Sequence, residues 1–336
     1  MLRKLLQFVS PTLVLALVSC GGAHGSEALA ASASYPDVPS VNSQALTSSV
    51  IKYVFVIAME NHASAQIYGS PDAPYINNTL IPQYARATNY VDNLGATVPS
   101  EPHYIWLEAG TNVFSDRTFT SDSNPSSTNS TASTAHLSTQ IRNATNGVTW
   151  MSYQEGMNAS TGTCPIFASG FYAPKHDPFI FFRDVSGATP SSTNAYCSSH
   201  HKPFSSLAAD LSAKAVASYN FITPNLCNDM HGLTGCPDSN TVRSGDTWLQ
   251  ANLPGLISFA KANAGVIFIV WDEPETTGTM PFLVIGPNVK AGYANSVTLS
   301  HSSLLKSTER ILGLPVQSNV SSANDFTSFF NTGMFP

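Results

Sequence analysis

Charged side chains are scarce in this chain of 336 residues, since Asp, Glu, Lys and Arg make up only 11% of it. An ordinary soluble domain has about 25%. The net charge is -6, and just 15 residues are Lys or Arg. Because a nucleic-acid surface needs clustered basic side chains, this composition argues against nucleic acid as a partner. Hydrophobic residues reach 43%, which excludes a chain that is disordered throughout.

Other signals are absent as well. The sequence contains no P-loop, no glycine-rich dinucleotide motif and no internal repeat. Beyond the amino terminus, no apolar run reaches the roughly 20 residues that cross a bilayer. The chain therefore consists mainly of apolar and small polar residues, and this composition suggests an exported protein.

The amino terminus supports export. Arg3 and Lys4 precede a short apolar stretch over residues 5–18, as in secretory signal peptides. Leu17-Val-Ser-Cys20 is similar to a bacterial lipobox, in which Cys20 becomes the lipidated first residue of the mature chain. An ordinary signal peptide cleaved after Ala30 is the alternative.

We therefore predict a signal peptide over residues 1–20, a polar tether over 21–45 and one domain over 46–336. The protein is expected in the cell envelope or secreted. Its only attachment to a membrane would be the lipid anchor, and we expect a monomer.

Four cysteines remain after Cys20, at positions 164, 197, 227 and 236. An even number in an exported chain predicts two disulfides. Of the three possible pairings, closest spacing favours Cys164 with Cys197 and Cys227 with Cys236. Free buried thiols are the alternative.

Apolar runs predict a buried parallel sheet. Tyr53–Met59 and Val266–Trp271 are continuous and rich in β-branched residues, as in strands buried on both faces. Shorter strands are expected at 179–182, 218–222 and 281–285, and helices at 104–109, 205–217, 247–262 and 302–312. This alternation predicts an α/β fold with a mostly parallel central sheet flanked by helices. The Ser-, Thr- and Asn-rich segment 115–146 is interpreted as a long surface excursion.

Polar residues follow the two long strands directly: Glu60 and Asn61 after the first, Asp272 and Glu273 after the second. Ligands bind at the carboxyl ends of parallel strands, so these side chains are expected at one sheet edge. Three close carboxylates need compensation, which a divalent cation such as Mg, Ca, Mn or Zn provides. The alternative is that they begin loops or cap helices.

Ser100 precedes Glu101-Pro102 at an expected helix start. A hydroxyl there can serve as a nucleophile, because the free amide groups favour an incoming phosphate. A plain N-cap serine is the alternative. Asp246 is interpreted as the N-cap of the helix that follows it.

His176 and His231 lie beside expected strand boundaries. Histidine can bind a phosphoryl oxygen or a metal, or protonate a leaving group. A structural histidine is the alternative, and it is our interpretation for His200, His201 and His301.

Several motifs together resemble the phosphoesterase family of bacterial phospholipases C and acid phosphatases, within the alkaline phosphatase superfamily. The matching segments are Val56-Ile-Ala-Met-Glu60-Asn61-His62, Pro99-Ser100-Glu-Pro102, Lys175-His176-Asp-Pro178-Phe179, Asn225-Leu-Cys-Asn-Asp229-Met-His231, Gly245-Asp246-Thr-Trp-Leu249, Trp271-Asp272-Glu273 and His301-Ser-Ser-Leu304. They run in the family's order over nearly the whole expected domain.

The resemblance implies a role for each matching residue. The metal ligands would be Glu60, Asn61, Asp272 and Glu273, and the nucleophile would be Ser100. The histidines around the phosphate would be His176 and His231. Asp229, beside them, and His103 would contact the substrate. Small family members usually carry Asn at position 103, and Ala63-Ser-Ala65 replaces polar and aromatic residues. Both departures concern substrate contacts.

The function implied is that of a metal-dependent acid phosphatase, since the chain is similar to the small secreted members. It would hydrolyse a phosphomonoester, such as a phosphoinositide or another phospholipid-derived compound, through a phosphoseryl intermediate. A phospholipase C acting on diesters is one alternative, and a non-catalytic surface lipoprotein is another.

Overall fold

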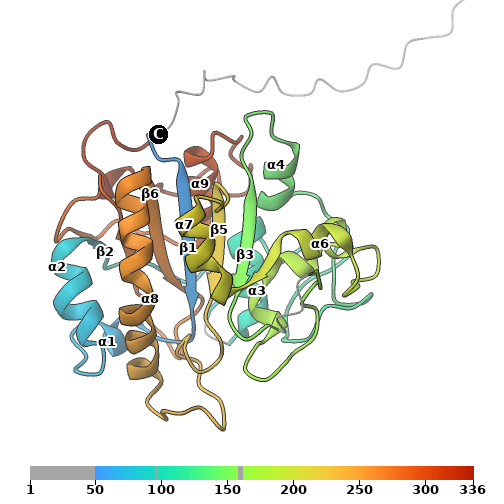
Figure 1. The fold of residues 1–336 in the computed structure, drawn as a ribbon, viewed down its shortest axis with the longest axis horizontal. Coiled ribbons are helices and arrows are strands. Elements are labelled where there is room, and N and C mark those ends of the chain that lie inside the picture. Colours follow the sequence, from blue (N-terminus) through green and yellow to red (C-terminus); the bar gives the residue numbers. More distant parts are fainter. Residues whose placement is uncertain (1–49, 96, 158–161) are drawn as a thin grey trace, which may run out of the picture. The chain divides into compact units, whose positions relative to one another are not determined.

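An eight-stranded sheet forms the centre of the computed structural model, which describes residues 50–95, 97–157 and 162–336 (Figure 1). The strand order is β4-β3-β5-β1-β6-β7-β2-β8. Strand bounds are β1 Tyr53–Met59, β2 Ala85–Ala87, β3 Trp150–Gln154, β4 His201–Pro203, β5 Tyr219–Thr223, β6 Gly265–Trp271, β7 Phe282–Ile285 and β8 Ala294–Asn295. Only β7 runs antiparallel to its neighbours within this sheet, so the predicted mostly parallel α/β fold is confirmed.

Helices cover both faces of the sheet. In Figure 1, α7 and α8 lie on the near face, and α3 and α9 lie behind the strands. Helix bounds are α1 Ser64–Ile67, α2 Ile81–Gln83, α3 Ser100–Ala109, α4 Leu137–Asn143, α5 Arg183–Ser186, α6 Ala195–Ser199, α7 Leu207–Ala213, α8 Thr241–Asn263 and α9 His301–Ile311. Shorter turns are η1 Ile76–Leu80, η2 Pro174–His176, η3 Pro178–Phe181, η4 Phe204–Ser206 and η5 Thr327–Phe329.

The two long strands lie side by side at the centre. All residues of β6 are buried, and all of β1 except its partly exposed first residue. The strands are parallel and in register to their last residues, Met59 and Trp271. Because both strands end at the same level, the polar residues that follow them lie together at one sheet edge.

The strand predicted over residues 179–182 is wrong, because most of this segment forms the 3-10 turn η3. Pro178 begins the turn with a fixed φ angle and no amide donor, which disfavours a central strand. The aromatic rings are buried nevertheless. Phe179 stacks on Trp150 at 4.5 Å, and Phe182 stacks on His136 at 3.9 Å. A short apolar run predicts burial better than it predicts conformation.

The helix predicted over residues 247–262 is longer, and the interpretation of Asp246 as its N-cap is wrong. Asn240 is the N-cap of α8 and accepts a hydrogen bond from the amide of Arg243. Asp246 lies inside α8 and accepts hydrogen bonds from the amides of Tyr75 and Ile76, at 2.9 and 2.8 Å. Its carboxylate therefore caps η1, a different segment.

The surface excursion predicted over residues 115–146 is wrong in part. The segment contains α4 and buries polar residues, including Asn129, Thr131 and His136. Their partners explain the burial: Asn129 donates to Glu101 at 3.0 Å, and the Thr131 backbone pairs with the segment around residue 182.

Both predicted disulfides form, Cys164–Cys197 and Cys227–Cys236. Among the helices of the described ranges, none is both long and apolar enough to cross a membrane. The predicted signal peptide, Cys20 and the whole of the tether predicted over residues 21–45 lie outside the described residues.

Candidate active site

The four predicted metal ligands lie together at the carboxyl ends of β1 and β6. Asp272 accepts a hydrogen bond from the Asn61 amide at 3.0 Å, which joins the two strand ends. Asn61 has a φ angle of 44°, in the left-handed region that Asn tolerates better than most residues. This tight turn brings the Asn61 side chain next to Glu60 and Glu273.

Ser100 is the first residue of α3, as predicted, but it does not cap the helix. The N-cap residue is Pro99, whose own side chain makes no capping hydrogen bond. The Ser100 hydroxyl lies 3.0 Å from Glu60 Oε2 and 3.4 Å from Glu273 Oε1. The serine is therefore held among the carboxylates.

His176 lies on the other side of Glu60. Its Nε2 is 3.2 Å from Glu60 Oε1, and its Nδ1 is 3.4 Å from Asp229 Oδ2. The ring stacks on Tyr104 of α3 at 5.0 Å. Burial, with the charges of neighbouring residues, holds the pKa of His176 well below its usual range. The neutral ring can thus serve as a ligand or a hydrogen-bond partner.

His231 is more accessible than His176, and the two ring centres are 5.9 Å apart. The His231 amide donates to Asp229 Oδ1 at 2.8 Å. Its Nδ1 lies 2.7 Å from the Gly232 carbonyl, so the neutral ring carries its proton there and leaves Nε2 free. Burial lowers the pKa of His231.

His103 is fully buried behind Glu273. Its Nδ1 lies 3.1 Å from Asp92 Oδ1, and its Nε2 lies 3.1 Å from the Val98 carbonyl and 3.7 Å from Glu273 Oε2. Burial opposes the charged ring, but the hydrogen bond with Asp92 and the nearby carboxylates outweigh it and raise the pKa of His103. The ring therefore lies next to Glu273, and a direct substrate contact of His103 stays a prediction.

The buried carboxylates carry more negative charge than their surroundings compensate. Burial raises the pKa of Glu60, Asp229 and Asp272 well above the usual range, and repulsion among them adds to the effect. Burial raises the pKa of Glu273 to about 7. Such a group of acids holds its charge only with a compensating cation.

Unpaired oxygen atoms show that the residues fit such a cation. Glu60 Oε1, Asp229 Oδ2 and Asp272 Oδ2 are buried without a hydrogen-bond partner among the described residues. The Asn61 side chain, by contrast, is satisfied, because its NH₂ group donates to Glu60 Oε2 at 3.1 Å and to Glu273 Oε1 at 3.2 Å. Carboxylate oxygens without a hydrogen-bond partner are the kind of ligand that a divalent cation binds.

The donor set does not select one ion. Ligand atoms of Glu60, His176 and Asp229 also lie within 4.8 Å of one another. Carboxylates and an amide suit Mg, Ca or Mn, and the nearby imidazole suits Zn.

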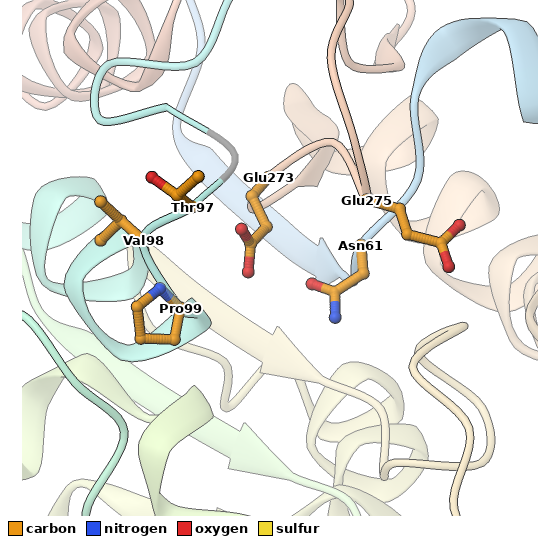
Figure 2. Close-up of a pocket in the computed structure, with 6 residues that line it drawn as sticks. All are labelled: Asn61, Thr97, Val98, Pro99, Glu273 and Glu275. Carbon is orange, nitrogen blue, oxygen red and sulfur yellow. The ribbon is translucent and has the colours of Figure 1, made fainter.

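A pocket of about 210 Å³ opens beside the predicted metal ligands Asn61 and Glu273 (Figure 2). Figure 2 shows Asn61 at the end of β1, with Glu273 between it and the segment that leads to Ser100. The lining residues are Asn61, Thr97, Val98, Pro99, Glu273 and Glu275. A substrate can therefore enter next to the metal-ligand candidates and the serine.

Three residues near the site had no role assigned from the sequence. Lys175 belongs to the family motif at residues 175–179, and its ammonium pairs with Asp122 at 2.5 Å. His301, interpreted as structural, lies 2.6 Å from the Asp272 carbonyl. The motif was a signal for Lys175, whereas nothing in the polar segment around Asp122 distinguished that residue.

Comparisons with known proteins show which family this chain is similar to. The model of the phosphoesterase family matches residues 75–315. A phosphatidylinositol-3-phosphatase of Mycobacterium tuberculosis is 28% identical over 295 residues, which cover 87% of this chain and 87% of the relative. A probable acid phosphatase of Kluyveromyces lactis is 27% identical over 287 residues, covering 80% of this chain but only 59% of that longer protein.

Solved structures show the same fold at low sequence identity. A phosphonate monoester hydrolase from Silicibacter pomeroyi has a TM-score of 0.50 and 12% identity, covering 85% of this chain and 77% of the other. A protein of the alkaline phosphatase superfamily from Vibrio parahaemolyticus has a TM-score of 0.51 and 11% identity, covering 80% and 68%. The chain belongs to the phosphoesterase family, and it is a phosphoric ester hydrolase with an alkaline phosphatase-like fold.

Proposed function

We propose that this protein is an exported, metal-dependent acid phosphatase that hydrolyses phosphomonoesters through a phosphoseryl intermediate. The observation that carries the proposal is the Ser100 hydroxyl, which lies at a helix start and contacts Glu60 and Glu273 instead of capping the helix. The names of the relatives support phosphomonoesters as substrates. A phosphoinositide or another phospholipid-derived phosphomonoester is the substrate class we favour.

Glu60, Asn61, Asp272 and Glu273 would hold the divalent cation. When bound, such an ion polarises a phosphoryl oxygen and lowers the pKa of a nearby hydroxyl. The protein's own residues then position the reacting groups, which is the main part of catalysis in phosphoryl transfer.

In the first step, the Ser100 oxygen attacks phosphorus in line with the leaving alcohol. The Oγ–phosphorus bond forms while the bond from phosphorus to the substrate oxygen breaks, and the serine proton passes to Glu60 Oε2, 3.0 Å away. In the second step, water attacks phosphorus and the Oγ–phosphorus bond breaks, which releases phosphate. Glu60 returns the proton to Ser100, and the proton that water loses restores the protonated form of His231. Between the two steps, the phosphoryl group is bonded to the Ser100 oxygen.

His231 is the proposed acid for the leaving oxygen. It is partly exposed, and its Nε2 is free of the hydrogen bond that occupies Nδ1. His176 is buried between Glu60 and Asp229 and acts on the phosphate side. Because burial lowers the pKa of His231, the protonated form that donates is populated at acid pH. This supports an acid phosphatase.

Ser100→Ala tests the nucleophile. The variant should fold, keep its metal and lose nearly all turnover of p-nitrophenyl phosphate, because the covalent intermediate cannot form. Ser258→Ala is the matched control, since Ser258 is an exposed serine of α8 whose hydroxyl only contacts the Pro254 carbonyl. Rapid quench of the wild type with labelled substrate should trap phosphate on the peptide that contains Ser100.

Turnover above about a tenth of wild type in Ser100→Ala would mean a barrier change under about 1.4 kcal/mol, and the nucleophile would lie elsewhere. Assays with p-nitrophenylphosphorylcholine, a diester, run alongside. Faster turnover of the diester would favour a phospholipase C.

A further inference from the structure

Asp122 connects the helix of the proposed nucleophile to a lysine. Its Oδ1 accepts a hydrogen bond from the Glu101 amide at 3.0 Å, directly after Ser100. Its Oδ2 accepts one from Lys175 Nζ at 2.5 Å. One carboxylate from the polar segment 115–146 therefore holds both the start of α3 and the lysine side chain.

Lys175 is tied to the site through its neighbour as well. The next residue, His176, lies 3.2 Å from Glu60 Oε1, and Glu60 Oε2 lies 3.0 Å from the Ser100 hydroxyl. The contacts thus run in a closed ring from Ser100 through Asp122 and Lys175 and back through Glu60. This ring ties the Lys175 ammonium to the start of α3 and the Lys175 backbone to His176.

The Lys175 ammonium has more hydrogen-bond donors than partners among the described residues. Its side chain is 22% exposed, and the one hydrogen bond that the described residues accept from it goes to Asp122. An ammonium has three donors, so two remain for a ligand.

We propose that Lys175 binds the non-bridging oxygens of the substrate's phosphoryl group, and that Asp122 is the residue that positions it. This rests on the proposed phosphatase function. A phosphomonoester brings two negative charges into a site already lined by carboxylates, and a fixed ammonium stabilises the charge on the transferring group. The polar segment 115–146 then has a function in the site, because it supplies Asp122.

The competing explanation is an ordinary ion pair that contributes little. Lys202 and Asp210 form such a pair at 2.8 Å, with Lys202 37% exposed. Lys202→Met is therefore a matched control for Lys175→Met. Both substitutions remove one ammonium from a lysine–aspartate pair.

The experiment uses the full metal-loaded protein and two probes, p-nitrophenyl phosphate for turnover and inorganic phosphate for binding by calorimetry. Lys175→Met should lower kcat/KM by about a hundredfold, the effect of removing one donor to a reacting oxyanion, and weaken phosphate binding at least tenfold. Lys175→Arg should keep most of the phosphate affinity. Lys202→Met should match wild type in both measurements.

Asp122→Asn separates positioning from binding. The amide oxygen can still accept from the Glu101 amide, whereas the Lys175 contact is weakened, so kcat should fall about tenfold while phosphate binding changes less than in Lys175→Met. A pair with only a structural role would instead lose thermal stability equally in both variants and keep wild-type phosphate affinity, which would overturn the proposal.

The outcomes also distinguish failure of the proposed Lys175 site from failure of the proposed phosphatase function. An active wild type with unchanged phosphate affinity in Lys175→Met overturns the role of Lys175 alone. A wild type that hydrolyses no phosphomonoester overturns the phosphatase function, while weaker phosphate binding in Lys175→Met would still support the lysine site.

Discussion

Asp272 shows at the scale of one residue how a buried charge indicates a ligand. Its Oδ1 accepts from the Asn61 amide, but its Oδ2 is buried with no hydrogen-bond partner among the described residues. A protein does not leave a buried carboxylate oxygen unpaired without a cost of several kcal/mol. The predicted ligand role therefore has a physical reason beyond the family motif.

Asp272→Asn should bind the metal at least a hundredfold more weakly and lose activity, because the variant keeps the side-chain shape but not the charge. Metal content after gel filtration and activity at saturating metal are the measurements. Asp238→Asn, which changes a partly exposed aspartate paired with Arg243, should keep both. Full metal content with normal activity in Asp272→Asn would instead mean that this aspartate only shapes the loop.

At the scale of an element, Glu309 links α9 to the segment that follows it. Its carboxylate is fully buried and lies 3.2 Å from the Gln317 amide through both oxygens. Burial raises the pKa of Glu309 to about 7. In the unfolded chain the group titrates near 4.3. Between these values the folded state binds a proton that the unfolded state does not, so this contribution to stability is lost as pH rises through about 7.

Glu309→Gln should remove that dependence, because glutamine is neutral at every pH. From pH 5 to pH 8 the free energy of unfolding should fall less in the variant than in wild type, by up to about 3 kcal/mol. Urea denaturation at pH 5, 6.5 and 8 measures it. Parallel curves for the two proteins would show that Glu309 is not the group responsible.

For the whole molecule, the stability should depend on metal and pH together. Without a cation, the carboxylates around Glu60 and Asp272 repel one another and resist ionisation. A chelator should therefore lower Tm, and by more at pH 8 than at pH 5, where protonation relieves the repulsion. Thermal melts with and without chelator at both pH values are the measurement, and Ser100→Ala should behave like wild type. The same Tm with and without chelator at pH 8 would argue against a metal at this site.

Much of this architecture could be predicted from local sequence. The runs at 53–59 and 266–271 form β1 and β6, because continuous β-branched residues favour strands buried on both faces. Parallel pairing then brings Glu60 and Asp272 to one edge. Close spacing likewise indicated the disulfide pairs. These features depend on burial patterns and short chain separations, which a sequence contains directly.

Side-chain partners far apart in the chain could not be predicted in this way. Ser100 could equally have capped its helix, and only the tertiary placement of the start of α3 next to the ends of β1 and β6 brings its hydroxyl to Glu60 and Glu273. Asp246 caps a segment 170 residues away, at Ile76, and Asp122 reaches the active site from a segment that looked like a surface loop. The sequence by itself determined which segments are buried and which polar residues end the strands, because both follow from local composition. The tertiary structure decided which atoms meet, because hydrogen-bond partners are selected by geometry across the whole fold.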